Sequence, residues 1–141
     1  MSSPVSDLGS LLASMEPILH EATLAYCVVP HGTDVSRFSA VATVSESEGL
    51  TLVIPESQAR AAGLEVLFRA AWITLTVHSD LQAVGLTAAF ATALGQAGIS
   101  CNVVAGAFHD HLFVPAERAQ DALAALRRLQ ATAVGQVPTA R

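Results

Sequence analysis

Between Trp72 and Arg128, the spacing of the apolar residues changes from that of a strand to that of a helix and back, in an order that few folds can accommodate. From Trp72 to His78, apolar and polar residues alternate, which predicts a half-buried strand. From Leu86 to Ala97 the apolar residues recur at helical spacing, and Gly98 is well placed to end that helix. A strand that leads into an amphipathic helix is the beginning of a crossover unit.

The chain then continues with a hairpin and a second helix. The β-rich segments Cys101 to Ala105 and His111 to Val114 flank a short turn, and Pro115 opens an alanine-rich helix. A βαββα run is most of a ferredoxin-like unit and lacks only a fourth strand beside the first. No sustained alternation follows Leu129. We therefore expect the fourth strand to come from the other half of the chain or from a second copy.

The amino-terminal half predicts a related lobe. Its expected elements are a short helix over Leu8 to Met15 after the capping residue Asp7, strands over Thr23 to Val29, Ala40 to Val44 and Leu50 to Ile54, and a helix between Pro55 and Gly63. The segments TLVIPESQARAAG and HLFVPAERAQDAL each place a strand before a proline and an alanine-rich helix, which indicates a diverged internal repeat. The predicted fold is therefore α+β, with two ferredoxin-like (βαββαβ) lobes whose antiparallel sheets share or exchange strands. We expect a first lobe over residues 1–68, a second lobe over 69–130 and a flexible tail over 131–141.

The composition limits the classes of partner. Apolar residues make up 52% of the chain and charged residues 13%, so we expect part of the surface to be covered in a homodimer. The net charge of -5, without a basic cluster, lacks the footprint of a nucleic-acid-binding protein. No apolar run reaches the ~18–20 residues that span a bilayer, so we expect a cytoplasmic protein with no membrane partner. Cys27 and Cys101 lack CxxC spacing and are expected to be buried thiols.

Several segments of the chain resemble the ACT-domain family. They are VGLTAAFATAL, GISCNVVAG and HDHLFVP in the second half, and SAVATVSESEGLTLVIPES in the first. The chain is most similar to the small tandem-ACT proteins related to the CASTOR amino-acid sensors. This resemblance implies a regulatory protein that is not an enzyme, needs no cofactor, and binds a small molecule, typically an amino acid, at an interface between ACT units. The longer sensors have carboxyl-terminal lobes that this chain lacks, which leaves open a pocket that forms only between subunits.

The junction between the first strand and helix of the second half is the candidate ligand site. The first turn of that helix offers backbone N–H groups and a positive dipole end, which suit a carboxylate, and Gly85 allows close approach. Asp80 could accept an ammonium group, while the neighbouring strand supplies backbone groups or an amide. The candidate ligand-binding residues are Asp80, Val84, Gly85, Leu86, Thr87, Asn102, Val103 and Val104. In the competing interpretation, Asp80 caps the turn, Gly85 serves helix packing and Asn102 bonds across the sheet.

The cluster His109, Asp110 and His111 is the most suggestive of a metal site. Histidines at i and i+2 on a strand share one face and could bind a divalent metal, with His78 as a third ligand. However, His109 and Asp110 fall in a predicted tight turn, and no Cys or Glu stands at ligand spacing. We therefore predict no bound metal, and expect His111 to be a structural or interface residue.

The sequence also argues against an active site. The run His78, Ser79 and Asp80 cannot form a hydrogen-bonded catalytic relay, because adjacent residues on a strand point to opposite faces. GxSxG, P-loop and GxGxxG motifs are absent. The leading hypothesis is an amino-acid-binding regulator that acts on another protein, with a slight preference for a cationic ligand. Two alternatives stay open: a ligand-free oligomerisation or scaffold module, and a small metal-dependent protein built on His78, His109 and His111.

Overall fold

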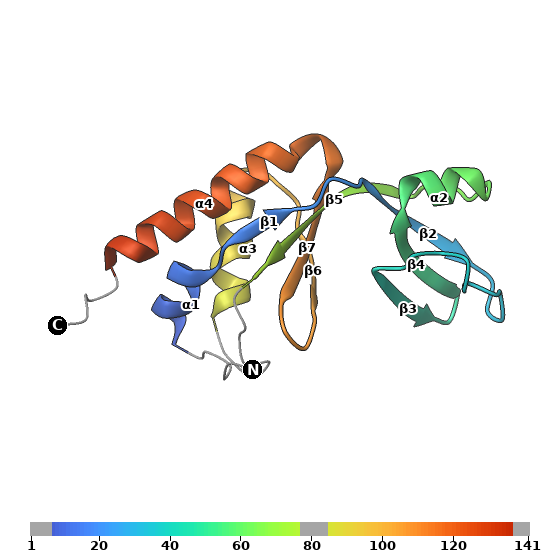
Figure 1. Ribbon diagram of the computed structural model, residues 1–141, viewed down its shortest axis with the longest axis horizontal. Coiled ribbons are helices and arrows are strands. Elements are labelled where there is room, and N and C mark those ends of the chain that lie inside the picture. Colours follow the sequence, from blue (N-terminus) through green and yellow to red (C-terminus); the bar gives the residue numbers. More distant parts are fainter. Residues whose placement is uncertain (1–6, 77–84, 137–141) are drawn as a thin grey trace.

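The computed structural model describes residues 7–76 and 85–136 and consists of two lobes joined by one long strand (Figure 1). Its elements in chain order are α1 (Leu8–Ser14), β1 (Pro17–Leu19), β2 (Leu24–Val29), β3 (Ala42–Glu46), β4 (Gly49–Pro55), α2 (Glu56–Ala61), β5 (Phe68–Leu75), α3 (Leu86–Gln96), β6 (Asn102–Ala105), β7 (Asp110–Pro115), a 3-10 helix η1 (Ala116–Arg118) and α4 (Ala119–Gln136). The strands form one seven-stranded antiparallel sheet. The predicted α+β class and antiparallel pairing are confirmed.

Strand β5 belongs to both lobes. Its first residues pair with β2, so the first lobe has the strand order β3-β4-β2-β5. Its later residues pair with β7 on one edge and with β1 on the other, which gives the second lobe the order β6-β7-β5-β1. The fourth strand of the second lobe therefore comes from the other half of the chain, which is one of the two sources that the sequence left open. The sequence did not predict β1, because three residues beginning with Pro17 are too few to show an alternating pattern.

The internal repeat is visible in the backbone. Pro55 and Pro115 each end a strand and precede a helix, and both have φ -53° and ψ 134°. In the register, Leu24 of β2 pairs with Pro55, and Ala70 of β5 pairs with Pro115. The two hairpin–proline–helix units thus occupy equivalent places in their lobes. The first lobe has a loop where the second has α3, and Val35 and Phe38 of this loop pack against its core.

The structure differs from the expected division of the chain in two places. First, α1 and β1 complete the second lobe: Leu11 and Met15 are fully buried in its core, and Gln130 of α4 donates to the Ala13 carbonyl at 3.1 Å. The expected boundary at residue 68 also falls on the first residue of the shared strand. Second, α4 continues to Gln136, so the helix includes residues that were expected to begin the tail. The alanine-rich composition there supports a helix without a marked apolar stripe, so the pattern alone did not predict this extension.

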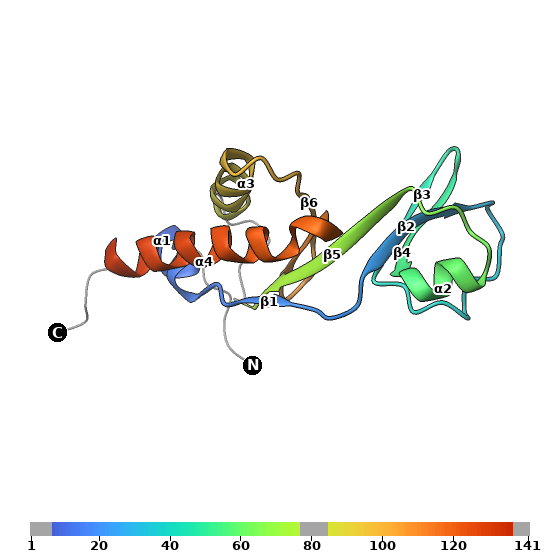
Figure 2. The same cartoon turned by 90° about the horizontal axis from the view of Figure 1, so that it is seen from above.

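The helices of the described residues all pack on the same face of the sheet. In β5, Ala71, Ile73 and Leu75 point to this face and form a core with α1, α3 and α4. The register carries this face into the first lobe, where β2 and β4 residues pack with Ala59 of α2. The opposite face, which we call the open face, carries no helix of the described residues. Figure 2 shows α1, α3 and α4 at one end of the molecule and α2 at the other. Because one sheet carries both helix-covered cores, the two lobes are tied together through β5.

The open face has a core of its own at the bend between the lobes. Leu24, Val53, Ala70 and Phe113 are at most 3% exposed there. The ring of Tyr26 makes edge contacts with Phe113 and Phe68, at centroid distances of 6.0 and 5.5 Å. Such edge-to-face pairs stabilise beyond the burial of their area. This third core holds the two lobes against each other without a helix.

Candidate functional site

The start of α3 and the strand β6 are the parts of the predicted ligand site that the structure describes. Asp80 and Val84, together with His78 and Ser79, lie outside the described residues. Gly85 is the N-cap of α3, and no described side chain caps the first turn. Leu86 is buried in the core, whereas Thr87 is exposed. Of the predicted residues that the structure describes at this turn, Thr87 is therefore the one whose side chain can meet a ligand.

Gly85 has a structural role that the sequence did not reveal. Its φ is +105°, a left-handed conformation that residues with a side chain rarely adopt. A Cβ placed on it would lie 3.1 Å from Cδ2 of Leu8 in α1. A Gly85→Val variant therefore cannot test the site without affecting folding, because the added side chain would strain the backbone and displace Leu8.

Asn102, Val103 and Val104 lie on β6, the edge strand beside β7. Asn102 and Val104 are exposed and pair with Phe113 and His111, so their side chains lie on the open face. Val103 points to the other face and packs against the core that contains α3. The Asn102 amide and the first turn of α3 are therefore on opposite sides of the sheet, and only backbone groups of β6 remain available to a ligand at α3.

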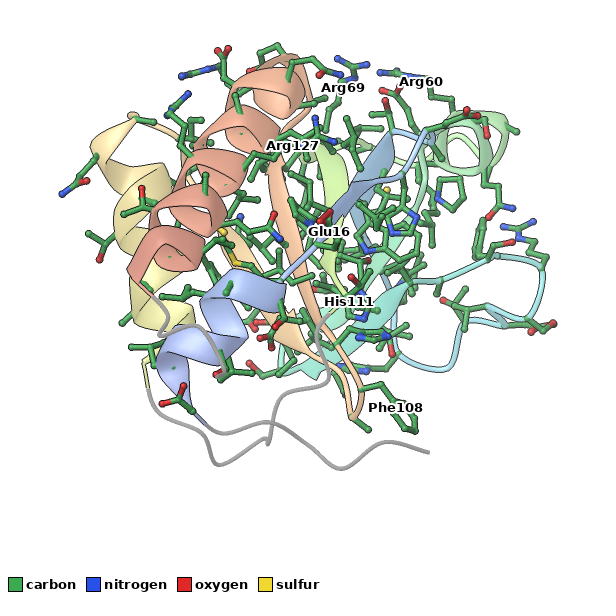
Figure 3. The ribbon with its side chains drawn as sticks, turned by 60° about the vertical axis from the view of Figure 1, so that its left-hand side comes forward. Glu16, Arg60, Arg69, Phe108, His111 and Arg127 are labelled. Atoms are coloured by element: carbon green, nitrogen blue, oxygen red, sulfur yellow. The ribbon has the colours of Figure 1, made fainter. Side chains whose placement is uncertain are left out.

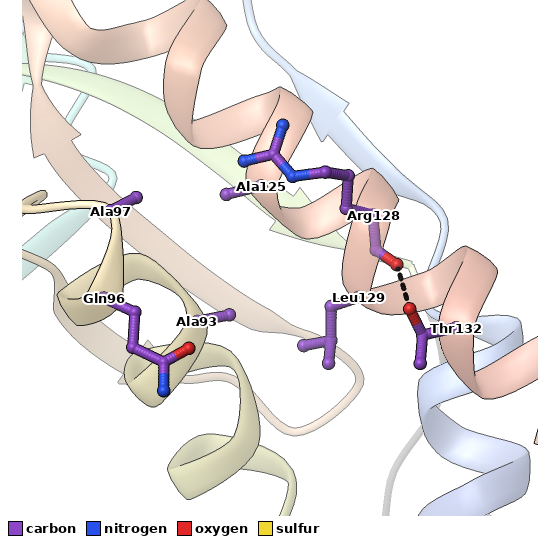
Figure 4. Close-up of a pocket in the computed structure, with 7 residues that line it drawn as sticks. All are labelled: Ala93, Gln96, Ala97, Ala125, Arg128, Leu129 and Thr132. Atoms are coloured by element: carbon purple, nitrogen blue, oxygen red, sulfur yellow. Dashed lines mark hydrogen bonds between the residues drawn. The ribbon is translucent and has the colours of Figure 1, made fainter.

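A groove between α3 and α4 is one of the hollows that the fold creates (Figure 4). It has a volume of about 300 Å³ and is lined by Ala93, Gln96, Ala97, Ala125, Arg128, Leu129 and Thr132. The Thr132 hydroxyl donates to the Arg128 carbonyl at 3.0 Å, so it is already satisfied within the helix. The remaining polar groups are the Gln96 amide and the Arg128 guanidinium, which leaves an alanine-lined groove with one cationic rim.

A second cavity lies where the chain crosses from the second lobe to the first. It measures about 330 Å³ and is lined by Leu19, His20, Glu21, Ala22, Thr23, Ala71, Ala116, Ala119 and Gln120. Its walls come from the end of β1 and the β1–β2 connection, from the shared strand β5, and from η1 and the start of α4. Sequence reasoning missed this cavity because its three walls are distant along the chain. Glu21, Thr23 and Gln120 give it a carboxylate, a hydroxyl and an amide, a set that suits a small polar ligand.

A hydrogen-bonded cluster on the open face, over β5 and β7, joins His20 and His111. His20 Nε2 lies 2.8 Å from Thr74 Oγ1, and Thr74 Oγ1 lies 3.0 Å from His111 Nδ1. The Trp72 indole N–H donates to the same Nδ1 at 3.2 Å. The His20 ring stacks on the Trp72 ring, with 3.5 Å between the ring centroids. Figure 3 shows His111 on the side of the sheet away from α3 and α4. The cluster thus ties the β1–β2 connection to β5 and β7.

The cluster requires a neutral His111. An indole nitrogen can only donate, so Nδ1 of His111 must accept and cannot carry a proton. Burial lowers the pKa of His111, and the nearby His109 lowers it further while Asp110 opposes them. Burial also lowers the pKa of His20, with a smaller contribution from His111. Burial raises the pKa of Asp110, against the effect of His111 and His109.

We expect the free energy of unfolding to decrease when the pH is lowered from about 7.5 to about 5.5. Histidine in an unfolded chain titrates near pH 6.5. The folded pKa values of His20 and His111 are lowered. Their contribution to stability is therefore fully present above about pH 6.5 and is lost as the pH falls through the folded values. Urea unfolding at the two pH values measures this change.

The matched variants for this test are His111→Asn and His31→Asn. The asparagine amide in the first variant keeps an acceptor but does not titrate, so the difference between the two pH values should shrink. His31 is an exposed turn residue that bonds to the Glu46 carbonyl, and its variant should behave like the wild type. The comparison between variants is needed because Asp110 acts in the opposite direction at acid pH. Equal stability of the wild type at both pH values would contradict the expectation.

The described residues offer no assembled metal site. Within residues 7–76 and 85–136, no three His, Cys, Asp or Glu side chains are placed to hold a metal ion. His109 lies in the β6–β7 turn and Asp110 opens β7, where it is 8% exposed. Cys27 is buried and Cys101 is partly buried, both as free thiols, and burial raises the pKa of Cys101 to about 11. A thiol with so high a pKa is a poor nucleophile at neutral pH.

Comparisons with known proteins agree with this architecture. Family models described as ACT domain match residues 3–71 and 68–128. A protein of unknown function from Vibrio cholerae, described as a possible transport protein, is 48% identical, with a TM-score of 0.78 over 87% of this chain and 95% of that one. The regulatory subunit of aspartate kinase from Thermus thermophilus is 12% identical, with a TM-score of 0.63 over 82% and 97% of the two chains. A comparison with curated proteins found no match. No helix among the described residues has the length and apolarity needed to cross a membrane.

Proposed function

Because the chain belongs to the ACT-domain family, with two ACT domains in tandem, we propose that it is a non-catalytic regulatory protein that binds a small ligand, an amino acid, at an interface between ACT units. The observation that carries this proposal is the tandem architecture itself, in which two ACT lobes share β5. A similar fold occurs in the regulatory subunit of aspartate kinase, which supports a regulatory use of the fold. The relation to the CASTOR amino-acid sensors is part of this proposal.

The proposed ligand site is the first turn of α3 together with the segment before it. No described side chain caps this turn, so its backbone N–H groups suit the carboxylate of an amino acid. Asp80 is proposed to accept the ammonium group, and the backbone of Asn102 to Val104 to complete the site. The turn follows the end of β5 that is remote from the junction with β2, so we propose that the second ACT unit of the interface belongs to another copy of the chain.

The first experiment is a thermal-shift screen of the protein against the common amino acids. A ligand that binds only the folded state adds roughly 2.7 kcal/mol of stability at about 100 times its dissociation constant. A selective rise in Tm with one amino acid is the expected result. If none of the amino acids changes Tm, the sensor proposal fails and an oligomerisation module becomes the better explanation.

We expect a Thr87→Glu variant to lose ligand binding. A carboxylate fixed in the first turn of α3 would repel and replace the ligand's own carboxylate, while its interaction with the helix dipole keeps the helix stable. The matched control is Thr87→Gln, which has the same size without the charge and should bind within a few-fold of the wild type. Isothermal titration with the amino acid found in the screen measures both. Equal binding by the two variants would place the site elsewhere, and the cavity lined by Glu21 and Gln120 would be tested next.

A further inference from the structure

The internal repeat gives the cavity beside the β1–β2 connection a counterpart in the first lobe. We call this cavity, which has a volume of about 330 Å³, the junction cavity. Pro55 and Pro115 occupy equivalent places in the strand register of their lobes. The residue after each proline is Glu56 in the first lobe and Ala116 in the second. Because Ala116 lines the junction cavity, the start of α2 is the corresponding place in the first lobe.

In the first lobe, this place holds a cluster of ion pairs. Glu56 accepts hydrogen bonds from the guanidinium groups of Arg60 and Arg69, which Figure 3 labels. Arg60 stands four residues later in α2, with its Nη2 atom 2.9 Å from Glu56 Oε2. Arg69 comes from the neighbouring strand β5, where it pairs with Ala25 of β2. The Glu56 side chain is only 18% exposed, so one carboxylate and two cations occupy the start of α2.

The second lobe has uncharged residues at the two helix positions of this cluster. Ala116 stands where the first lobe has Glu56, and Gln120, four residues later, stands where it has Arg60. Both Ala116 and Gln120 line the junction cavity. The carboxylate and one of the two cations of the first lobe are therefore missing here.

The third position of the cluster, that of Arg69, corresponds to Glu21. The neighbour of β2 in the first lobe is β5, and the neighbour of β5 in the second lobe is β1. Beyond β1, one more hydrogen bond of 2.9 Å, donated by the His20 main-chain N–H, continues this pairing. The next residue, Glu21, is thereby placed opposite Ala71, as Arg69 lies opposite Ala25. A carboxylate thus stands where the first lobe has a cation, and no described side chain forms an ion pair with it.

We propose that the junction cavity binds a small organic cation, an alkyl chain with an ammonium or guanidinium head, whose charge meets the Glu21 carboxylate. The ligand would supply the cation that the second lobe lacks. Gln120 and Thr23 offer an amide oxygen and a hydroxyl to its remaining N–H groups. The volume is at the lower end of the ~300–1,000 Å³ of ligand pockets. The apolar walls that would contact the alkyl chain are Leu19, Ala71, Ala116 and Ala119.

The junction cavity is separate from the site proposed at the first turn of α3. None of its lining residues belongs to α3, and it offers a carboxylate where the α3 turn offers N–H groups. The two sites therefore suit opposite charges. A probe with a cationic head and no carboxylate tests the cavity without depending on the amino-acid proposal.

Titration of the isotope-labelled protein with n-butylammonium or n-butylguanidinium chloride tests the proposal, with backbone amide chemical shifts as the readout. We expect saturable shifts at Thr23, Ala71 and Ala116. The dissociation constant should be on the order of 1 mM, because the ligand is small and Glu21 is exposed. Sodium chloride and n-butanol at the same concentrations should not produce these shifts. Glu21→Gln should weaken binding about tenfold or more, since it removes a charge-assisted hydrogen bond.

Two opposite substitutions at Gln120 give a second test of the same contact. In Gln120→Arg, an internal guanidinium should pair with Glu21, as Arg60 pairs with Glu56, and abolish binding. In Gln120→Glu, a second carboxylate should tighten binding several-fold. The matched control is Glu117→Gln, because Glu117 is exposed on η1 but does not line the cavity. Its affinity should stay within about twofold of the wild type.

The absence of saturable shifts with both cations at about 10 mM would overturn the proposal. Equal weakening by Glu21→Gln and Glu117→Gln would also overturn it, because the cation would then respond only to the negative charge of the whole chain. Thr87→Glu should leave the cation titration unchanged, so failure of the α3 site and failure of the cavity are seen separately. Circular dichroism of each variant distinguishes loss of binding from loss of the fold.

Discussion

Phe113→Ala should lower the free energy of unfolding by about 3–5 kcal/mol, the usual cost of emptying a buried aromatic site. Phe113 is fully buried on the open face, in the core between the lobes. The centroid of its ring is 6.0 Å from that of Tyr26. No helix of the described residues covers this core, so the neighbouring strands cannot close the cavity without changing the bend of the sheet. Denaturant unfolding of the wild type and the variant measures the loss.

The control for this prediction is Phe108→Ala in the β6–β7 turn. The same atoms are removed there from a side chain that is 52% exposed, so a clearly smaller loss is expected. Figure 3 shows Phe108 at the tip of the hairpin, away from the bend. A loss below about 1 kcal/mol for Phe113→Ala would mean that the bend is not a cooperative core and that the lobes unfold separately.

Leu11→Ala should cost about 2–5 kcal/mol, although residue 11 lies in the half of the chain that the sequence assigned to the other lobe. Leu11 of α1 is fully buried in the core formed by α3, α4 and the second-lobe strands. Its removal should therefore destabilise the second lobe. Hydrogen exchange of the α4 amides, measured together with the unfolding free energy, shows whether the second lobe is the part that is destabilised.

Leu8→Ala is the matched control for Leu11→Ala. Leu8 is in the same helix but is 37% exposed, so fewer contacts are lost. If the two variants have the same stability as the wild type, α1 is not an integral part of the second lobe. If Leu11→Ala accelerates hydrogen exchange in the first lobe alone, α1 stabilises the first lobe and its assignment to the second lobe is wrong.

The local elements of this protein were readable from the sequence because they depend on near neighbours. Asp7 caps α1 by accepting a hydrogen bond from the Ser10 N–H at 3.0 Å, as predicted. Gly98 follows α3 with φ +73°, the left-handed conformation expected of a glycine that ends a helix. The apolar stripe of α3 and the alternation in β5 also follow from the side-chain period of each element. Such features are set by sterics within a few residues, so one sequence is enough to predict them.

The tertiary structure decided the features that depend on distant residues. The short segment β1 pairs with β5, so β5 belongs to both lobes. Gly85, which was expected to let a ligand approach the backbone, lies against Leu8 of α1. The strand register places the Asn102 side chain on the face of the sheet opposite to α3. His20 and Thr74 meet although they are 54 residues apart in the chain. Contacts at such separations are selected by the burial of the whole apolar surface, and no local pattern encodes them.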